Sequence, residues 1–230
     1  MREVKAGIEY KINLNNKSFL LGRKKYKLLD KINSFGSISE AAKLTEISYR
    51  TALNHIEKIE SSLDIKIVET QKGGKGGGGK TSLSEEGFAI LKECKKINAI
   101  MELHKDANEL KSVVKKIDSE KGVMIIGIKD IDINIPLNNK YEIGDKILAL
   151  INYDNIFLML EPYDSSIRNN LKGKIVELSL NNKIIRVKID IGGIFIYSDI
   201  TISAAKELDL ELGKEIYVGF KAMSVATLKL

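Results

Sequence analysis

The chain has 230 residues, enough for two modest domains that each bury a core of their own. Its longest apolar runs, such as residues 123–128, are too short to cross a bilayer, and no charged-then-apolar signal segment opens the chain. One cysteine excludes an internal disulfide and fits a reducing cytoplasm, and the presence of only two histidines argues against a Cys/His zinc site. We therefore expect a cytoplasmic protein with no membrane partner and no bound metal.

The net charge of +6 is concentrated in the first part of the chain. Residues 1–83 carry a charge of +7, and the remaining residues carry −1. This imbalance predicts that the N-terminal part faces a polyanion such as a nucleic acid. The alternative is a basic surface that is only solvated.

The start of the chain predicts a β-hairpin followed by a helix. Asn15 and Asn16 lie between two strand-like runs within residues 4–21, which is the pattern of a tight hairpin turn. Residues 23–35 place apolar side chains at helical spacing, and Gly36 directly after them is a typical helix end.

Two further helices joined by a tight turn are expected next. Ser37 and Glu40 form a capping box, which predicts that a helix begins there. Residues 45–47 make the turn, and residues 48–63 form the following helix. The apolar residues of this last helix make one buried stripe: Ala52, Leu53, Ile56, Ile59 and Leu63.

The polar face of residues 48–63 is the candidate DNA-reading surface. A side chain near the start of such a helix can enter the major groove, where arginine suits a guanine edge and asparagine an adenine edge. We therefore assign base contacts to Arg50 and Asn54. The other candidates on this face are Ser48, Tyr49, Thr51 and Lys58, with Thr51 and Lys58 assigned to phosphate or methyl groups. The alternative is a solvated helix face.

A loop of glycine and lysine follows. Residues 65–69 predict a short strand, and the segment KGGKGGGGK at 72–80 precedes a return strand. Its glycines cannot pack a core, but they let the ammonium groups of Lys72, Lys75 and Lys80 approach phosphates closely. We interpret this strand, loop and strand as the wing of a winged helix-turn-helix domain.

The same loop also matches a nucleotide-binding motif. Residues 74–81 satisfy G-x-x-x-x-G-K-[ST], the phosphate-binding P-loop, so an NTPase is an alternative. However, a P-loop helix begins at its Lys-Thr pair, whereas the next helix here has its capping box at Ser82 and Glu85. The alternating strand-helix pattern of a parallel α/β sheet is also missing from the sequence.

Residues 84–117 predict one long helix that pairs with a second copy. Its apolar residues recur at alternating steps of four and three, the seam of a coiled coil: Ile90, Cys94, Ile97 and Met101. His104 and Asn108 continue this seam as polar members. We expect a homodimer, since a two-fold symmetric operator requires two reading heads. The alternative is that this face packs on its own domain.

From Gly122 onward the chain changes to short strands. Segments 143–160 and 212–230 match each other at an offset of 69 residues, which predicts two small β units in tandem, each a partly closed barrel. The expected fold class is therefore α+β. The expected divisions are a DNA-binding domain with its dimerisation helix over 1–117, and a β domain over 118–230 made of units 118–163 and 164–230.

These features together resemble a known family. The residues Ser37-Ile38-Ser39 and Ile47-Ser48-Tyr49-Arg50, with the GGKGGGGK loop, resemble the winged helix-turn-helix of ModE-type molybdate-responsive transcription regulators. The motif Ser-Ile-Arg-Asn at 166–169 resembles the signature of molybdate-binding Mop (TOBE-like) domains, and the pairs Ile200-Thr201 and Lys221-Ala222 match later segments of that domain. The resemblance covers nearly the whole chain.

The resemblance implies a cytoplasmic homodimer with molybdate or tungstate as its effector ligand and an inverted-repeat operator in double-stranded DNA as its partner. It assigns the oxyanion contacts to six residues: Ser166, Arg168, Asn169, Thr201, Lys221 and Ala222. Hydroxyl, amide and cationic donors suit a tetrahedral dianion. Ala204 stands where the family usually has a serine, and the first β unit lacks S-x-R-N, so we expect that unit to act as a scaffold.

We therefore expect a transcriptional regulator with no catalytic residues, rather than an enzyme. No Ser/His/Asp, paired-carboxylate or metal-ligand constellation stands out in the sequence. Two alternatives remain at this point. The same architecture could sense another anion or no ligand, or the chain could be an intracellular storage or transport-associated module for molybdate or tungstate, for which the basic wing would be unneeded.

Overall fold

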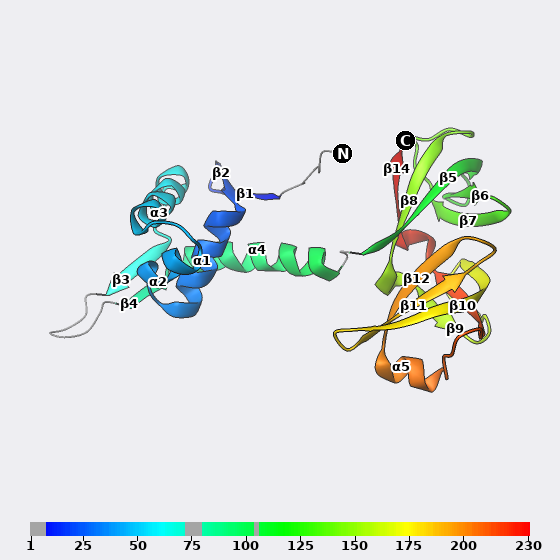
Figure 1. Ribbon diagram of the computed structural model, residues 1–230. Coiled ribbons are helices and arrows are strands. Elements are labelled where there is room, and N and C mark those ends of the chain that lie inside the picture. The colour runs from blue at the N-terminus through cyan, green and yellow to red at the C-terminus, as the bar shows by residue number, and fades with distance from the viewer. Residues whose placement is uncertain (1–7, 72–79, 104–105) are drawn as a thin grey trace, which may run out of the picture. The chain divides into compact units, whose positions relative to one another are not determined.

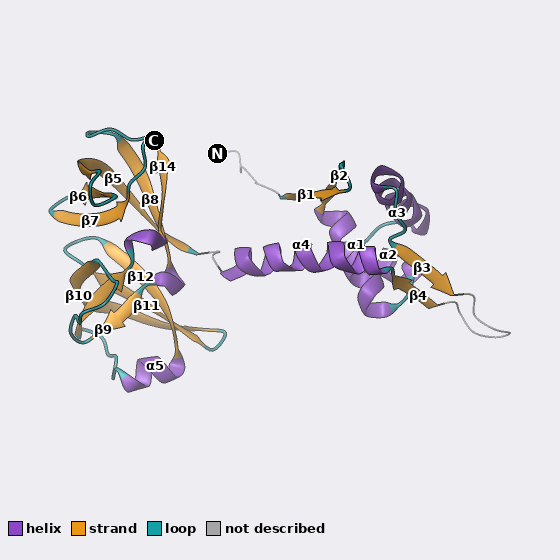
Figure 2. Cartoon of the chain, turned by 180° about the vertical axis from the view of Figure 1, so that it is seen from behind, coloured by secondary structure: helices purple, strands orange, loops and turns teal. Residues whose placement is uncertain are grey.

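The chain is a mixed α and β protein that divides into two compact units, Met1–Met101 and Glu102–Leu230 (Figure 1). The computed structural model describes residues 8–71, 80–103 and 106–230. Helices concentrate in unit 1 and strands in unit 2 (Figure 2). Among the described residues, every helix is either too short or too polar to cross a membrane.

Unit 1 consists of a hairpin, three helices, a second hairpin and a long helix. Its elements are β1 (Glu9–Leu14), β2 (Lys17–Gly22), α1 (Arg23–Phe35), α2 (Ile38–Leu44), α3 (Tyr49–Leu63), β3 (Val68–Gln71), β4 (Lys80–Leu83) and α4 (Glu85–Leu103). The strand predicted at 65–69 begins later, at Val68, where pairing with β4 starts. Both hairpins are antiparallel.

The turn and cap residues of unit 1 confirm the predicted boundaries of its first elements. Asn15 and Asn16 both have positive φ, as a two-residue hairpin turn requires. Gly36 ends α1 with a φ of 65°, and its amide donates to the carbonyl of Ile32. Ser37 caps α2 by accepting from the amide of Glu40, and Ser48 caps α3 in the same way.

The core of unit 1 forms where α1, α2, α3 and the first half of α4 meet. Its fully buried residues include Leu28, Ile32, Ala41, Ala52, Ile59, Leu91 and Cys94. Ala41 and Ala52 are small, which lets the backbones of neighbouring helices approach closely. An ion pair of 2.7 Å between Lys95 and Asp30 also links α4 to α1.

The prediction of one helix over 84–117 is wrong in its second half. Helix α4 ends at Leu103, and Ala107–Asp118 is strand β5. From Asn108 to Val114 buried and exposed residues alternate, and this period of two fits a strand with one face on a core. Asn108 therefore belongs to a strand, and His104 lies outside the described residues. The division between the units falls at 101/102 and not at 117/118.

The predicted coiled-coil seam is also corrected. Ile90 and Cys94 lie in the core of their own unit, and only Ile97 and Met101, each more than 40% exposed, remain on the surface. Packing on α1 explains this, because the Lys95–Asp30 ion pair holds that part of α4 against α1.

The P-loop interpretation fails at its helix. Lys80 and Thr81 lie in strand β4, paired with β3, and Ser84 rather than Ser82 caps α4 by accepting from the amide of Gly87. A P-loop requires its Lys-Thr pair at a helix start. Residues 74–79 of the motif lie outside the described residues.

Unit 2 contains two five-stranded antiparallel sheets. Its elements are β5 (Ala107–Asp118), β6 (Val123–Ile128), β7 (Ile131–Pro136), β8 (Lys146–Asn152), η1 (Tyr153–Asn155), β9 (Phe157–Met159), β10 (Asn169–Asn181), β11 (Ile184–Asp190), β12 (Phe195–Thr201), α5 (Ile202–Glu207), β13 (Glu215–Phe220), η2 (Ala222–Ser224) and β14 (Val225–Lys229). The sheet orders are β14-β8-β5-β6-β7 and β9-β13-β10-β11-β12.

The two sheets exchange their last strands. In chain order β9 follows β8, yet it pairs with β13; β14 follows β13, yet it pairs with β8. The short helices η1 and η2 redirect the chain at these two crossings. The predicted tandem units 118–163 and 164–230 are therefore not separate, because each sheet is completed by a strand from the other unit.

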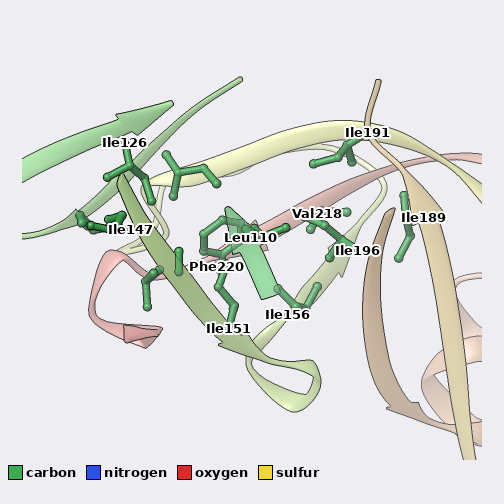
Figure 3. Close-up of a cluster of buried hydrophobic side chains, with 14 of the residues drawn as sticks. Leu110, Ile126, Ile147, Ile151, Ile156, Ile189, Ile191, Ile196, Val218 and Phe220 are labelled. Atoms are coloured by element: carbon green, nitrogen blue, oxygen red, sulfur yellow. The ribbon is translucent and has the colours of Figure 1, made fainter. Parts of the chain in front are cut away.

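One continuous hydrophobic core joins the two sheets (Figure 3). Ile126, Ile147 and Ile151 contribute from the first sheet, and Ile189, Ile196 and Val218 from the second. Since the strands of both sheets bury side chains in the same core, neither sheet can be removed without exposing it.

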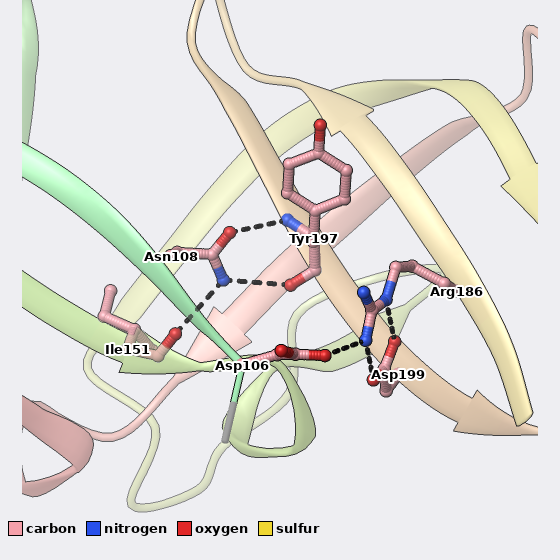
Figure 4. A network of polar contacts seen from close by, with 6 residues as sticks. All are labelled: Asp106, Asn108, Ile151, Arg186, Tyr197 and Asp199. Carbon is pink, nitrogen blue, oxygen red and sulfur yellow. Dashed lines mark hydrogen bonds and ion pairs between the residues drawn. The ribbon is translucent and has the colours of Figure 1, made fainter. Parts of the chain in front are cut away.

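Two asparagines at the starts of the long strands bridge the sheets. Asn108 accepts from the amide of Tyr197 at 2.7 Å and donates to the carbonyl of the same residue at 2.9 Å (Figure 4). Asn169 makes the same pair of bonds, at 2.7 and 2.9 Å, with the backbone of Asn134. Each asparagine thus bonds to an edge strand of the other sheet, Asn108 to β12 and Asn169 to β7. This equivalence marks β5 and β10 as corresponding strands of a repeat.

Gly87 gives a stability test of the unit 1 packing. A Cβ atom there would lie 2.2 Å from the carbonyl oxygen of Ile67. A glycine-to-alanine change inside a helix ordinarily stabilises by about 1 kcal/mol. Here we expect Gly87→Ala to lower the free energy of unfolding by about 1–3 kcal/mol, as overpacking does. Urea unfolding followed by helical circular dichroism measures the change.

Ala89→Gly, at an exposed position of the same helix, is the matched control. It should cost only about 0.5–1 kcal/mol, through backbone entropy. A Gly87→Ala protein more stable than the parent would contradict the close approach of α4 to Ile67.

Candidate functional site

The outer face of α3 carries exposed cationic and amide side chains. Arg50, Asn54 and Lys58 are exposed, and none of their side chains makes a hydrogen bond or ion pair with another described residue. Tyr49 is 53% exposed beside them. These four of the six predicted DNA-contacting residues on α3 and its cap are therefore open to a ligand.

Ser48 and Thr51 are engaged in the cap of α3. The Ser48 hydroxyl accepts from the amide of Thr51 at 3.0 Å and lies 2.8 Å from the Thr51 hydroxyl. These two residues fix where α3 begins, and so they determine how the exposed side chains that follow are presented.

A second group of cations lies beside this face. Burial lowers the pKa of His55, and the ammonium groups of Lys25, Lys58 and Lys24 lower it further. Lys24 and Lys25 are in the first turn of α1, so the start of α1 and the middle of α3 share one basic surface. The neutral form of the His55 imidazole is therefore favoured on this surface.

The β3–β4 hairpin brings a further lysine to unit 1's surface. Gln71 pairs with Lys80 at the end of the hairpin next to the connecting segment, and Lys80 is exposed there. The amide of Thr81 donates to the carbonyl of Gly36, which fixes β4 to the junction of α1 and α2. The other two predicted loop contacts, Lys72 and Lys75, lie outside the described residues.

In unit 2, two of the predicted oxyanion ligands lie next to each other. Strands β10 and β13 are antiparallel, and Asn169 at the start of β10 pairs with Phe220 at the end of β13. Arg168 directly precedes the first residue of this pair and Lys221 directly follows the second. Both are exposed, and Ser166 is exposed two residues before Arg168.

Asn169 has a different role from the one predicted. It is only 2% exposed, and its side chain is bonded to the backbone of Asn134 on β7. The carbonyl of the neighbouring Arg168 accepts from the side chain of Asn134. Asn169 is therefore a positioning residue, which fixes the start of β10 and with it the backbone of Arg168.

Thr201 lies apart from this pair of cations within one chain. It pairs with Ile184, which in turn pairs with Asn181, so Thr201 is level with the far end of β10 from Asn169. Its hydroxyl accepts from the amide of Ala204 and caps α5. The chain therefore brings Arg168 and Lys221 together but leaves Thr201 elsewhere on the same sheet.

Thr201 and Ala204 line a cavity of about 590 Å³. Its acidic lining residues include Asp106, Asp154 and Asp199, and no lysine or arginine occurs among its described lining residues. Carboxylates repel a dianion, so this cavity alone does not form an oxyanion site.

An arginine that sequence reasoning missed bonds to two of the acidic residues that line the cavity, Asp106 and Asp199 (Figure 4). Arg186 donates from Nε and Nη2 to both oxygens of Asp199, each at 2.8 Å, and from Nη2 to Asp106 at 2.6 Å. Its guanidinium lies 4.6 Å from the ring centre of Tyr153. The bonds from Asp199 and Asp106 raise the pKa of Arg186, which stays charged. Arg186 and Asp199 are directly opposite each other on β11 and β12. An arginine and an aspartate on neighbouring strands were the only sign of this ion pair in the sequence.

Comparisons with known proteins match the C-terminal region. The TOBE domain model matches residues 165–227. A probable molybdenum-pterin-binding protein of Haemophilus influenzae is 48% identical over 61 residues, which are 26% of this chain and 88% of that protein. The molybdate/tungstate import ATP-binding protein WtpC of Pyrococcus abyssi is 31% identical over 101 residues, 44% of this chain, but the chain spans only 28% of that protein's length.

One relative matches both units. The molybdenum transport protein ModE of Herbaspirillum seropedicae is 26% identical over 243 residues, which cover 89% of this chain and 90% of that protein. The TOBE match contains the paired ends of β10 and β13 with Arg168 and Lys221. The chain belongs to the ModE-type family of proteins with a C-terminal TOBE domain.

Proposed function

We propose that this chain is a cytoplasmic transcriptional regulator that binds molybdate or tungstate with unit 2 and an inverted-repeat operator in double-stranded DNA with unit 1, as a homodimer. The observation that carries the proposal is the juxtaposition of Arg168 and Lys221 at the paired ends of β10 and β13. The molybdenum proteins related to this chain support the choice of oxyanion. The role is binding rather than catalysis.

The chemistry of this corner suits a tetrahedral dianion. Arg168 and Lys221 supply two positive charges, and Ser166 supplies a hydroxyl donor. Charge-assisted hydrogen bonds to an oxyanion are shorter and about twice as strong as neutral ones. The backbone at Ala222, where η2 begins, lies directly after Lys221 and completes this half of the site.

The remaining donor comes from a second copy. Thr201 is distant from Arg168 along β10, and the cavity beside it has an acidic lining. In a two-fold dimer, Arg168 of one copy and Thr201 of the other form one complete oxyanion site. The symmetry gives two such sites, so the dimer binds two oxyanions. Asn169 acts indirectly in this site, by holding the strand that carries Arg168.

For DNA binding, α2, the turn at 45–47 and α3 form the helix-turn-helix, and the β3–β4 hairpin is the wing. Arg50 and Asn54 near the start of α3 read base edges in the major groove, and Lys58 contacts phosphate. The wing lysines at 72, 75 and 80 also contact phosphates. Ser48 and Thr51 set the start of the reading helix through the cap that they form.

The second half of α4 provides a surface for the dimer in unit 1. Ile97, Ile100 and Met101 are 44%, 57% and 43% exposed, and residues at these spacings share one face of a helix. Contact with the same face of a second copy removes this apolar area from water. Dimerisation then presents two α3 helices to the two halves of an inverted repeat.

Removing the Arg168 side chain tests the oxyanion site. Arg168→Ala should lower molybdate affinity at least tenfold, or about 1.4 kcal/mol, because a charge-assisted contact is lost. Calorimetric titration of the full chain should give about two bound oxyanions per parent dimer.

Lys172→Ala is the matched control, because Lys172 is an exposed cation on the same strand that pairs with Glu215 at 2.7 Å. Its affinity should equal that of the parent. An Arg168→Ala protein with unchanged affinity would place the oxyanion elsewhere, and a parent chain that binds neither molybdate nor tungstate at millimolar concentration would contradict the proposed ligand.

Two substitutions on α3 test the DNA-reading face, on an operator selected from random duplexes. Arg50→Ala should cost about 1–3 kcal/mol on that operator and relax specificity at one base pair. Lys58→Ala should weaken all duplexes alike and reduce the salt dependence by about one unit of log K against log salt. Fluorescence anisotropy over a salt series measures both effects.

Lys121→Ala in unit 2 is the control, because it also removes one positive charge from the chain. Lys121 is exposed on the turn between β5 and β6. It should leave DNA affinity unchanged. If Arg50→Ala and Lys58→Ala behave like this control, α3 is not the reading helix.

A further inference from the structure

We propose that Ser165 is a positioning residue of the oxyanion site, because its hydroxyl fixes the turn against which the guanidinium of Arg168 lies. Ser165 is not among the six residues assigned to the oxyanion, and it acts on the anion only through Arg168. This role rests on the proposed function, since it explains how one chain places the cation that the oxyanion meets.

The Ser165 hydroxyl closes a tight turn. Its oxygen accepts a hydrogen bond from the amide of Ile167 at 3.1 Å. A serine or threonine that accepts from the amide two residues later mimics a backbone turn. Because Ile167 is only 7% exposed, its amide has little access to water as an alternative partner. The hydroxyl therefore fixes the course of the chain from Ser165 to Ile167.

The guanidinium of Arg168 is bonded to this turn. Its Nη1 donates to the carbonyl of Ser165 at 2.5 Å and to the carbonyl of Ile167 at 3.4 Å. Both carbonyls belong to the residues that the Ser165 hydroxyl ties together. An exposed arginine side chain otherwise samples many rotamers, and fixing it when a ligand binds costs free energy. The turn selects one position of the guanidinium before an anion arrives.

A guanidinium can hold a turn and an anion at the same time. It is planar and carries five N–H donors on three nitrogens. In Arg168 only Nη1 is bonded to the described part of the chain, so Nε and Nη2 are available to an oxyanion. The turn therefore orients the donors of Arg168 without using all of them.

The backbone of Arg168 is held by a different set of bonds. Its carbonyl accepts from the side chain of Asn134, and the neighbouring Asn169 is bonded to the backbone of Asn134. Asn134 and Asn169 thus fix where the residue begins, and Ser165 fixes where its charge lies.

Lys221 has no comparable support for its charge. Its ammonium is exposed and makes no hydrogen bond or ion pair with another described residue, although β13 fixes the backbone up to Phe220. Of the two cations at the paired ends of β10 and β13, Arg168 is thus the one whose charge is placed in advance. Loss of the turn should therefore act on the oxyanion through Arg168.

A double-mutant cycle in the full chain tests this role. Molybdate affinity is measured by calorimetry for the parent, Ser165→Ala, Arg168→Ala and the double variant. Ser165→Ala should lower the affinity about fivefold, which is the effect of one ordinary hydrogen bond. In the Arg168→Ala background the same change should alter the affinity less than twofold, because the guanidinium that Ser165 positions is gone.

Two further variants separate positioning from a loss of structure. Ser165→Thr keeps a hydroxyl that can close the same turn and should restore parental affinity. Ser119→Ala removes an exposed hydroxyl from the turn between β5 and β6 and should also bind like the parent. The circular dichroism spectrum of Ser165→Ala should match that of the parent, since the turn lies outside the helices and strands.

The outcomes distinguish this role from the proposed function. Parental affinity in Ser165→Ala, with weak binding in Arg168→Ala, overturns the role of Ser165 and leaves the proposed function standing. Equal losses from Ser165→Ala in both backgrounds also overturn it, because Ser165 would then act independently of Arg168. A Ser165→Thr protein as weak as Ser165→Ala contradicts a role for the hydroxyl.

Two results would reach further. Parental affinity in Arg168→Ala overturns the oxyanion site and the role of Ser165 together. A parent chain that binds neither molybdate nor tungstate is a failure of the proposed function itself.

Discussion

The exchange of β9 and β14 between the two sheets is the constraint on which unit 2 depends. Each sheet is completed by a strand that the chain delivers from the other, and both bury their side chains in one core. Asn108 and Asn169 reinforce this arrangement with paired backbone bonds across the sheets. As a result, the paired ends of β10 and β13 are fixed both by their own sheet and by the bonds of Asn169 to Asn134 on β7. The positions of Arg168 and Lys221 are thereby fixed before any ligand arrives, which reduces the ordering cost of binding.

The same rigidity explains why one chain holds only part of the proposed oxyanion site. Arg168 precedes one end of β10, whereas Thr201 pairs with Ile184 at the level of the other end of that strand. In the proposed site the missing donor comes from another copy, so oxyanion binding and the pairing of two β regions would be one event. Under the proposed function, ligand binding that changes how two copies meet would alter the spacing of the proposed DNA-reading helices, and this is a coupling between distinct sites.

The sequence predicted the local features of unit 1 well, because they depend on short-range chemistry. Gly36, Ser37 and the Asn15-Asn16 turn each set a boundary through their own backbone preference or cap. The strand at Ala107–Asp118 was missed because Asn108, although polar, falls by chance on the seam spacing that continues from α4. That error hid Asn108, the residue equivalent to Asn169 and the clearest mark of the repeat. The strand exchange and the Arg186 contacts depend on pairings between distant residues, which no local pattern encodes.

Complementation between two defective copies tests the central claim most directly. Arg168→Ala and Thr201→Ala homodimers should both lose tight molybdate binding. If each site combines Arg168 of one copy with Thr201 of the other, a purified heterodimer of the two variants has one doubly damaged site and one intact site. Calorimetry should then give one oxyanion per heterodimer with the affinity of the parent protein. A heterodimer with no site of parental affinity would contradict the account, because it would mean that both residues act from the same chain.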